Sequence, residues 1–221
     1  MYMHNTVQKY KDIISVINRK IEEQKINLTP KVIAVSKTFK LEKILPLIEY
    51  GHLDYGENKV QEAIDKWSAI KQKKPNIKLH LIGKLQTNKV KHAVKIFDFI
   101  HSVDSIKLAK KIVDEQHKQN KNIKLFIQVN IGNEEQKSGV KVDKIEELII
   151  FSKEANLNVI GLMCIPPANE DPDKYFNEIK TLSKKFNLSE ISMGMSSDYL
   201  KAVENHSTYL RIGSSIFGSR I

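Results

Sequence analysis

Short, unbroken runs of apolar residues alternate along the chain with longer stretches in which apolar residues recur every three or four positions. The run at 32–35, "VIAV", predicts a strand buried on both faces, as in a parallel sheet. The stretch at 5–24 has Ile13, Ile17 and Ile21 at helical spacing and predicts a helix before that strand. The remaining alternation predicts strands at 53–55, 77–83, 97–103, 123–131, 158–165, 190–194 and 207–213, and helices at 41–50, 59–71, 87–93, 105–119, 142–155, 172–186 and 197–204.

Eight strands, each except the last followed by a helix, match a (β/α)8 TIM barrel. We expect one domain over residues 1–221, in which residues 1–28 form a helical extension. A doubly wound open sheet gives the same alternation. Polar or glycine-containing segments follow nearly every strand, and a barrel builds its site from the loops after all strands, whereas an open sheet uses one crevice. These segments therefore favour the barrel.

The composition limits the kinds of partner. A formal net charge of +10 raises the possibility of a nucleic-acid-binding barrel, but only three of the 36 basic residues are arginine, the cation that such interfaces favour. The lysines alternate with acidic residues and indicate solvated helix faces. No apolar run approaches the roughly 18 residues of a membrane span, and no secretory signal is evident. The single cysteine, Cys164, fits a reducing cytoplasm, so a cytoplasmic location is expected.

Lys37 follows the first strand directly, in "KVIAVSKT". An unpaired ammonium beside a core is costly to desolvate, so this lysine either reaches solvent or has a chemical task. The segments "SMGMSSD" (192–198) and "RIGSSIFG" (211–218) follow the seventh and eighth strands, where barrels commonly bind phosphate. Serine at a helix start can also be an ordinary cap, but two such segments at the two expected positions favour phosphate.

Lys37, the two serine-containing segments and Arg211 are the groups that would anchor pyridoxal 5′-phosphate (PLP). The lysine amine would form a Schiff base with the aldehyde, the serine and glycine residues would hold the phosphate, and the arginine would face the ring nitrogen. A metal site is not expected, because His80, His92 and His101 lack the spacing of zinc ligands.

The chain resembles the pyridoxal phosphate homeostasis protein family, the YggS and PROSC group, whose barrel is similar to the N-terminal domain of alanine racemase. The resemblance runs from about residue 32 to the end through "AVSKT", "YGEN", "HLIGKLQTNK", "HSVD", "QVNIGNEEQKSG", "GLMCIPP", "SMGMSSD" and "RIGSSIFG". It implies a Schiff base on Lys37 and a contact of Arg211 with the ring nitrogen. It also implies phosphate contacts from Ser196, Ser197, Gly213 and Ser214, and positions near the cofactor for Asn58 and His80.

The resemblance implies a cytoplasmic carrier or regulator of PLP, with PLP-dependent apoenzymes as partners. Racemisation needs a second base, which in alanine racemase comes from a C-terminal domain that this sequence does not show. We therefore expect a regulator rather than an enzyme, and a monomer. A PLP-dependent racemase or lyase that uses Lys37 alone is the first alternative, and a basic nucleic-acid-binding barrel is a weaker one.

Overall fold

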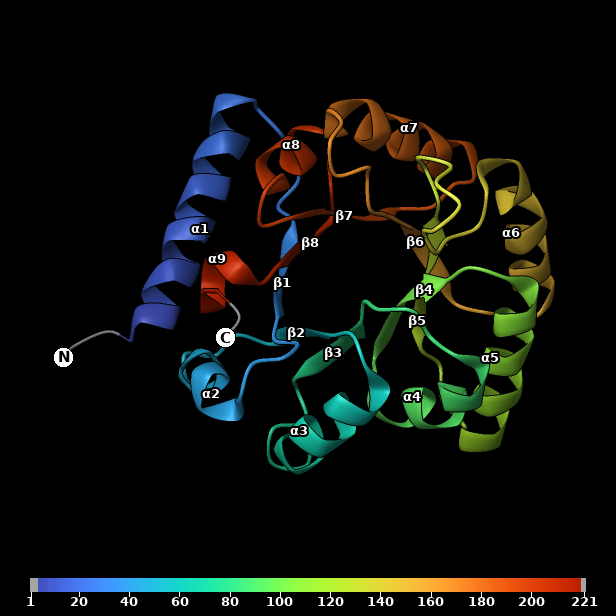
Figure 1. Ribbon diagram of the computed structural model, residues 1–221, viewed down its shortest axis with the longest axis horizontal. Helices are drawn as coiled ribbons and strands as arrows, with labels where there is room; N and C mark the ends of the chain where they lie inside the picture. Colours follow the sequence, from blue (N-terminus) through green and yellow to red (C-terminus); the bar gives the residue numbers. More distant parts are fainter. Residues whose placement is uncertain (1–3, 220–221) are drawn as a thin grey trace.

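Eight parallel strands pair in chain order and close into a barrel in the computed structural model, which describes residues 4–219 (Figure 1). Strand β1 pairs with β2 on one side and with β8 on the other, where Lys31 lies opposite Tyr209 and Ala34 opposite Ile212. This closure confirms the predicted TIM barrel and excludes the open sheet. The strands are β1 (Lys31–Val35), β2 (Asp54–Glu57), β3 (Lys78–Leu81), β4 (Phe99–Val103), β5 (Lys124–Val129), β6 (Val159–Cys164), β7 (Glu190–Met195) and β8 (Tyr209–Ile212).

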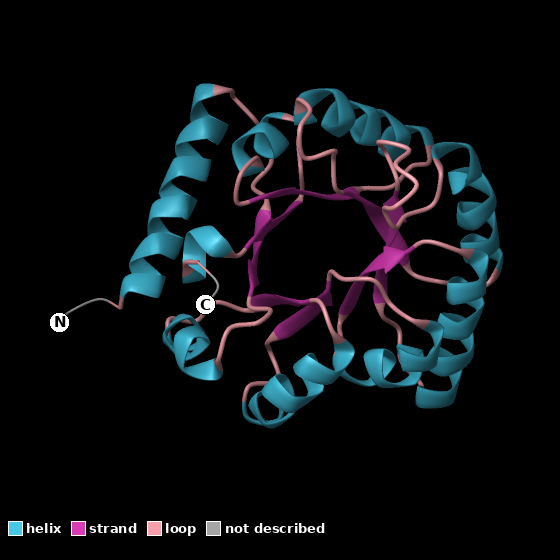
Figure 2. Cartoon of the chain, in the orientation of Figure 1, coloured by secondary structure: helices cyan, strands magenta, loops and turns pink. Residues whose placement is uncertain are grey.

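Helices surround the barrel on its outer face (Figure 2). They are α1 (Asn5–Glu23), α2 (Leu41–Glu49), α3 (Val60–Lys73), α4 (Val90–Ile96), α5 (Ile106–Gln119), α6 (Ile145–Glu154), α7 (Pro172–Lys185), α8 (Tyr199–Glu204) and α9 (Ser214–Phe217). The predicted helices at 87–93 and 142–155 each begin with a turn of 3-10 helix, at Thr87–Lys89 and Val142–Lys144. The strand predicted at 53–55 lies at Asp54–Glu57, because its register with β3 extends to Glu57 opposite Leu81.

Helix α1 precedes the barrel and packs against α2, α8 and α9 (Figure 1). Its buried face includes Val7, Ile13 and Ile17, whose spacing is that of one helical face. The helices after β7 and β8 contain only six and four residues, so the outer ring is thin there. Helix α1 covers that sector and confirms the predicted N-terminal helix. None of the helices within residues 4–219 is long and apolar enough to cross a membrane.

Side chains fill the inside of the barrel, as in other TIM barrels. An apolar cluster lies there, separate from the larger core between the strands and the helices; its buried members are Ile33, Val35, Phe99, Phe126, Met163 and Tyr209. Two histidines, His80 and His101, share this interior and stack on Phe99 and Phe126 with ring centroids 4.2 Å apart in each pair. The filled interior supports the loops at the carboxyl ends of the strands.

Candidate functional site

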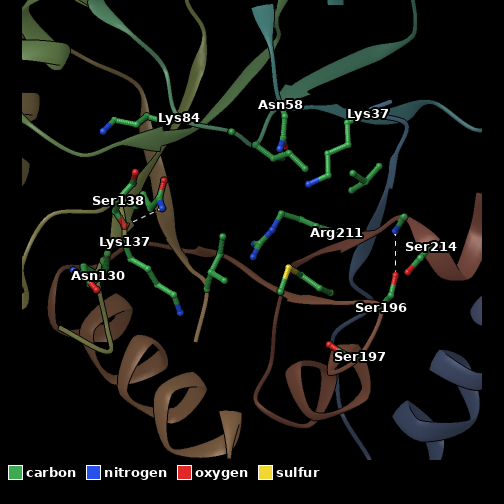
Figure 3. Close-up of a pocket in the computed structure, with 18 of the residues that line it drawn as sticks. Lys37, Asn58, Lys84, Asn130, Lys137, Ser138, Ser196, Ser197, Arg211 and Ser214 are labelled. Carbon is green, nitrogen blue, oxygen red and sulfur yellow. Dashed lines mark hydrogen bonds between the residues drawn. The ribbon is translucent and has the colours of Figure 1, made fainter. Parts of the chain in front are cut away.

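A cavity of about 590 Å³ opens at the carboxyl ends of the strands (Figure 3). Its lining comes from the ends of β1, β5, β7 and β8 and from the loops that follow every strand except β4. Seven of the eight residues predicted to contact a cofactor line this one cavity: Lys37, Asn58, Ser196, Ser197, Arg211, Gly213 and Ser214. Residues far apart in the sequence are thus brought together where the barrel fold places an active or binding site.

The backbone on both sides of Lys37 is fixed by groups from β2 and α3. The amide of Ser36 donates to the carbonyl of Gly56 (2.9 Å), and its carbonyl accepts from Nζ of Lys66 (2.9 Å). On the other side, the amide of Thr38 donates to Oε1 of Glu62 (2.6 Å). Thr38 has a φ of 68°, a left-handed conformation that costs a β-branched residue energy and needs such support. The side chain of Lys37 extends into the cavity (Figure 3).

The carboxylate of Glu57 is fully buried beneath this turn and organises it. Its Oε1 accepts from Oγ of Ser36 (2.7 Å), Nε1 of Trp67 (2.9 Å) and Nζ of Lys66 (2.9 Å). Burial raises the pKa of Glu57, although these three donors oppose the shift. The contacts tie the loop after β1 to β2 and α3, so the position of Lys37 depends on Glu57.

Hydrogen-bond donors converge on the other side of the cavity, where the loops after β7 and β8 meet. The amides of Gly213 and Ser215 both lie near Oγ of Ser196, at 3.3 and 3.4 Å. Gly213 also lies close to β1, since a Cβ at this position would lie 3.2 Å from the carbonyl oxygen of Val35. With the hydroxyls of Ser196 and Ser214, the amides make a set of donors that suits a phosphate group.

Arg211 extends from β8 into the cavity and is only 4% exposed. Its Nη1 donates to Oγ of Ser192 (2.7 Å), and its Nη2 donates to the carbonyl of Cys164 (2.8 Å). No carboxylate forms an ion pair with Arg211 within residues 4–219. Burial lowers the pKa of Arg211. The site therefore holds a buried guanidinium whose planar edge is fixed by neutral acceptors.

Asn58 follows β2, and its side chain lies beside that of Lys37 in Figure 3. The loop after β3 crosses close to it: a Cβ on Gly83 would lie 2.4 Å from the carbonyl oxygen of Asn58. Only glycine permits this approach. The contact brings the loops after β2 and β3 together at the wall of the cavity.

Sequence reasoning missed a polar wall opposite the serine loops. It consists of Lys84, Gln128, Asn130, Gln136, Lys137 and Ser138. The side-chain Nε2 of Gln128 donates to the carbonyl of Ser138 (3.1 Å). Nζ of Lys137 donates to the carbonyl of Pro166 (3.1 Å) and pairs with Glu134. The signal for this wall was present in the polar segments "GKLQTNK" and "NIGNEEQKSG" that follow β3 and β5.

His80 does not line the cavity, although the family resemblance implies a position near the cofactor for it. It is the third residue of β3, points into the barrel and is 0% exposed. Its ring bonds to Asp54 and His101 instead. The residues that do reach the cavity from this strand lie two to four positions later, at Ile82, Gly83 and Lys84. Within residues 4–219, no three or more His, Cys, Asp or Glu side chains are grouped so as to hold a metal ion.

Comparison with known proteins identifies the family. The family model for the alanine racemase N-terminal domain matches residues 15–221. A pyridoxal phosphate homeostasis protein of Aquifex aeolicus is 39% identical over 200 residues, which cover 86% of this chain and 87% of that protein. The chain belongs to the pyridoxal phosphate homeostasis protein family. A second member, from Vibrio alginolyticus, is 36% identical over 99% of both chains.

The solved structures include another related barrel, PipY of Synechococcus elongatus. PipY without PLP superposes with a TM-score of 0.81 at 34% identity, and the match covers 91% of this chain and all of PipY. PipY with PLP bound superposes with a TM-score of 0.78 at 33% identity over the same shares. Membership of the pyridoxal phosphate homeostasis protein family thus agrees with both the sequence and the fold.

Proposed function

We propose that this protein binds PLP reversibly in the cavity and acts in intracellular PLP homeostasis. One observation carries the proposal: Lys37, a serine and glycine donor set and a buried arginine face the same cavity. These are the groups that PLP requires, namely an amine for its aldehyde, donors for its phosphate and a polar contact for its ring. The PLP-bound structure of the relative PipY supports the assignment.

The residues fit the parts of PLP as follows. Ser196, Ser197 and Ser214, with the amide of Gly213, would bind the phosphate, and Arg211 would meet the ring nitrogen. Lys37 would bind the aldehyde covalently as a Schiff base, a condensation in which the amine nitrogen replaces the carbonyl oxygen and water leaves. Asn58, beside Lys37, would contact the cofactor near this bond. His80 acts from below the cavity and not by direct contact.

A carrier or regulator fits this site better than an amino-acid racemase or lyase. An arginine at the ring nitrogen disfavours ring protonation, and PLP enzymes use the protonated ring as their electron sink. Among the described lining residues, the ionisable groups besides Lys37 and Arg211 are Lys84 and Lys137. An enzyme would have to use Lys37 as its only base or one of these two lysines as its second base. If the PLP-loaded protein exchanged the Cα hydrogen of amino acids for deuterium in D2O, the protein would be a PLP-dependent enzyme and not only a carrier or regulator.

The setting of this function is part of the proposal. We assign the protein to the cytoplasm, which the single cysteine supports, because one cysteine cannot form an intramolecular disulfide and so fits a reducing compartment. PLP-dependent apoenzymes would receive the cofactor. We propose that the protein acts as a monomer. Light scattering after gel filtration tests the monomer.

The decisive experiment is an absorbance spectrum of the purified protein with added PLP, before and after borohydride reduction. We expect a band near roughly 420 nm that reduction removes while fixing the cofactor to the protein. In Lys37→Ala the band and the fixed cofactor should both be lost. Lys40→Ala is the matched control, because Lys40 lies three residues away, is exposed and does not line the cavity. Equal spectra for wild type, Lys37→Ala and free PLP would refute the proposal.

A further inference from the structure

A continuous line of hydrogen-bonded side chains crosses the barrel interior beneath the cavity. Asp54, at the start of β2, bonds through Oδ1 to Nε2 of His80 (3.0 Å), and Nδ1 of His80 meets Nε2 of His101 (3.0 Å). Nδ1 of His101 meets Oγ of Ser192 (2.9 Å), which accepts from Nη1 of Arg211 (2.7 Å). The line uses β2, β3, β4, β7 and β8 and joins the amino-terminal end of the barrel to the cavity.

The inner members of this line are inaccessible to solvent. His80, His101 and Ser192 are each 0% exposed, in an interior that TIM barrels usually fill with branched aliphatic side chains. Burying such polar groups costs free energy unless every one of them finds a partner. Here each ring nitrogen of both histidines has a partner within 3.0 Å. Only Asp54, with a side chain 23% exposed, reaches solvent from the far end.

The donors and acceptors of the line allow one order when Asp54 is ionised. A guanidinium only donates, so Ser192 accepts from Arg211 and has its own proton left to donate to Nδ1 of His101. A neutral imidazole has one donor and one acceptor, so Nε2–H of His101 donates to Nδ1 of His80. Nε2–H of His80 then donates to the carboxylate of Asp54. All four bonds point from Arg211 towards Asp54.

The charges around the line agree with this order. Burial lowers the pKa of His80, and burial together with the neighbouring His80 and Arg211 lowers the pKa of His101 further, so both rings are neutral. Burial tends to raise the pKa of Asp54, but the hydrogen bond from His80 and the nearby His52 and Lys31 oppose it, and the pKa is lowered. The other ionisable groups that face Asp54 or His80 are Tyr10, Lys31, His52, Tyr55, Asp98 and Tyr209.

A proton on Asp54 would favour the opposite order. The carboxylic acid would donate to Nε2 of His80, which would move the remaining N–H of each imidazole to Nδ1. Nδ1–H of His101 would then point at Ser192, and the hydroxyl would lose the acceptor for its own proton. A change at one end of the barrel thereby alters the hydrogen bonding of Arg211 at the other.

We propose that Asp54, His80, His101 and Ser192 are positioning residues, which hold Arg211 in the orientation that meets the cofactor and couple it to the ionisation of Asp54. The inference rests on the proposed function only for the identity of the ligand that Arg211 meets. The order of the hydrogen bonds can be tested in the cofactor-free protein.

The first test is the 15N NMR spectrum of the histidine rings in the protein without cofactor. We expect His80 and His101 to be neutral, with the proton on Nε2 in both, and to remain so through neutral pH. Asp54→Leu removes the final acceptor of the line. In this variant we expect the ring protons of His80 and His101 no longer to be confined to Nε2. A ring in wild type that carries its proton on Nδ1, or on both nitrogens, would overturn the inference.

The second test is PLP affinity and the pH profile of the visible band. Asp54→Leu and Ser192→Ala should each weaken PLP binding about tenfold, the size expected for losing a hydrogen bond to a charged group, and should move the pH profile in the same direction. Asp54→Asn keeps an acceptor and should restore most of the affinity. The double variant should be no weaker than either single variant, because both break one line.

Tyr209→Phe is the matched control. Its ring packs against both histidines, with centroids 5.9 and 6.1 Å away, but its hydroxyl meets Nζ of Lys31 and not the line. It should bind PLP as wild type does. If Asp54→Leu binds PLP as tightly as wild type, or if the effects of Asp54→Leu and Ser192→Ala multiply, the inference fails. If wild type itself does not bind PLP, the proposed function fails and the NMR test alone decides the inference.

Discussion

Glu57 links the loop that carries Lys37 to the rest of the fold, so its replacement tests that link. Glu57→Leu leaves the donors of Ser36, Lys66 and Trp67 without their shared acceptor, and we expect a loss of about 3 to 5 kcal/mol in the free energy of unfolding. In Glu57→Gln the amide oxygen can take the place of Oε1, while Oε2 has no hydrogen-bond partner among the described residues. This variant should lose about 1 kcal/mol. Urea unfolding measures the loss of free energy in both variants. Equal losses would show that the shared acceptor at Oε1 does not stabilise the fold.

The raised pKa of Glu57 makes a prediction about pH. The unfolded chain releases this proton near the ordinary pKa of 4.5, before the folded protein does. Because the folded state then binds more protons, the contribution of Glu57 to the free energy of unfolding falls as pH rises from 4.5 through the raised pKa. Urea unfolding of wild type and Glu57→Gln should show wild type losing stability relative to the variant over that range. If wild type instead gained stability relative to Glu57→Gln as the pH rises, the pKa of Glu57 would be lowered in the folded protein, as an ion pair with Lys66 would do.

Several site residues could be predicted from the sequence because each lies within two residues of the end of a predicted strand. Lys37, Ser196 and Gly213 are of this kind. His80 could not be placed, because a strand residue faces either the barrel interior or the helices, and one position of register decides which. The hydrogen-bonded line through Ser192 was invisible for a related reason: its five members lie on five strands, and closure of the barrel alone brings them together.

At the scale of elements, α1 contributes stability through one buried face. Ile17 is 1% exposed against the barrel helices, whereas the adjacent Val16 is 36% exposed. Ile17→Ala should reduce the free energy of unfolding by about 2 to 4 kcal/mol, the usual cost of truncating a buried isoleucine. Val16→Ala should change it by about 0.5 kcal/mol or less. Thermal or urea unfolding distinguishes them, and a similar small effect of both would show that α1 is not part of the cooperative fold.

The periodicity of apolar residues gave the order and type of the elements except for the short helix α9 after β8, and it did not give all their ends. The two 3-10 turns at Thr87–Lys89 and Val142–Lys144 read as helix in the sequence, since a turn of 3-10 helix and the start of an α-helix share the same residues. The strands predicted at 77–83 and 207–213 extend too far at their carboxyl ends, because the residues that continue them into the cavity, Ile82, Gly83 and Gly213, are apolar or glycine. Local pattern cannot separate a strand from the cavity wall that continues it.

At the scale of the whole molecule, the pairing of β1 with β8 makes the first and last strands neighbours. Neither can leave without opening the barrel, and α1 adds contacts to α8 and α9. We therefore propose that residues 1–221 unfold as one domain, with a single thermal transition at the same temperature by calorimetry and by far-ultraviolet circular dichroism. An earlier transition in either signal would indicate a part that unfolds independently.

The indole of Trp67 gives the molecule an internal optical probe. It is the one tryptophan in the sequence, it is fully buried, and its N–H donates to the carboxylate that also holds Ser36, the neighbour of Lys37. The wavelength of indole emission shifts with the local electric field. We therefore expect it to depend on the charge of Glu57 and on the conformation of the adjoining turn. Intrinsic fluorescence can therefore follow events at Lys37 in real time, in an unlabelled protein and without any change to its sequence.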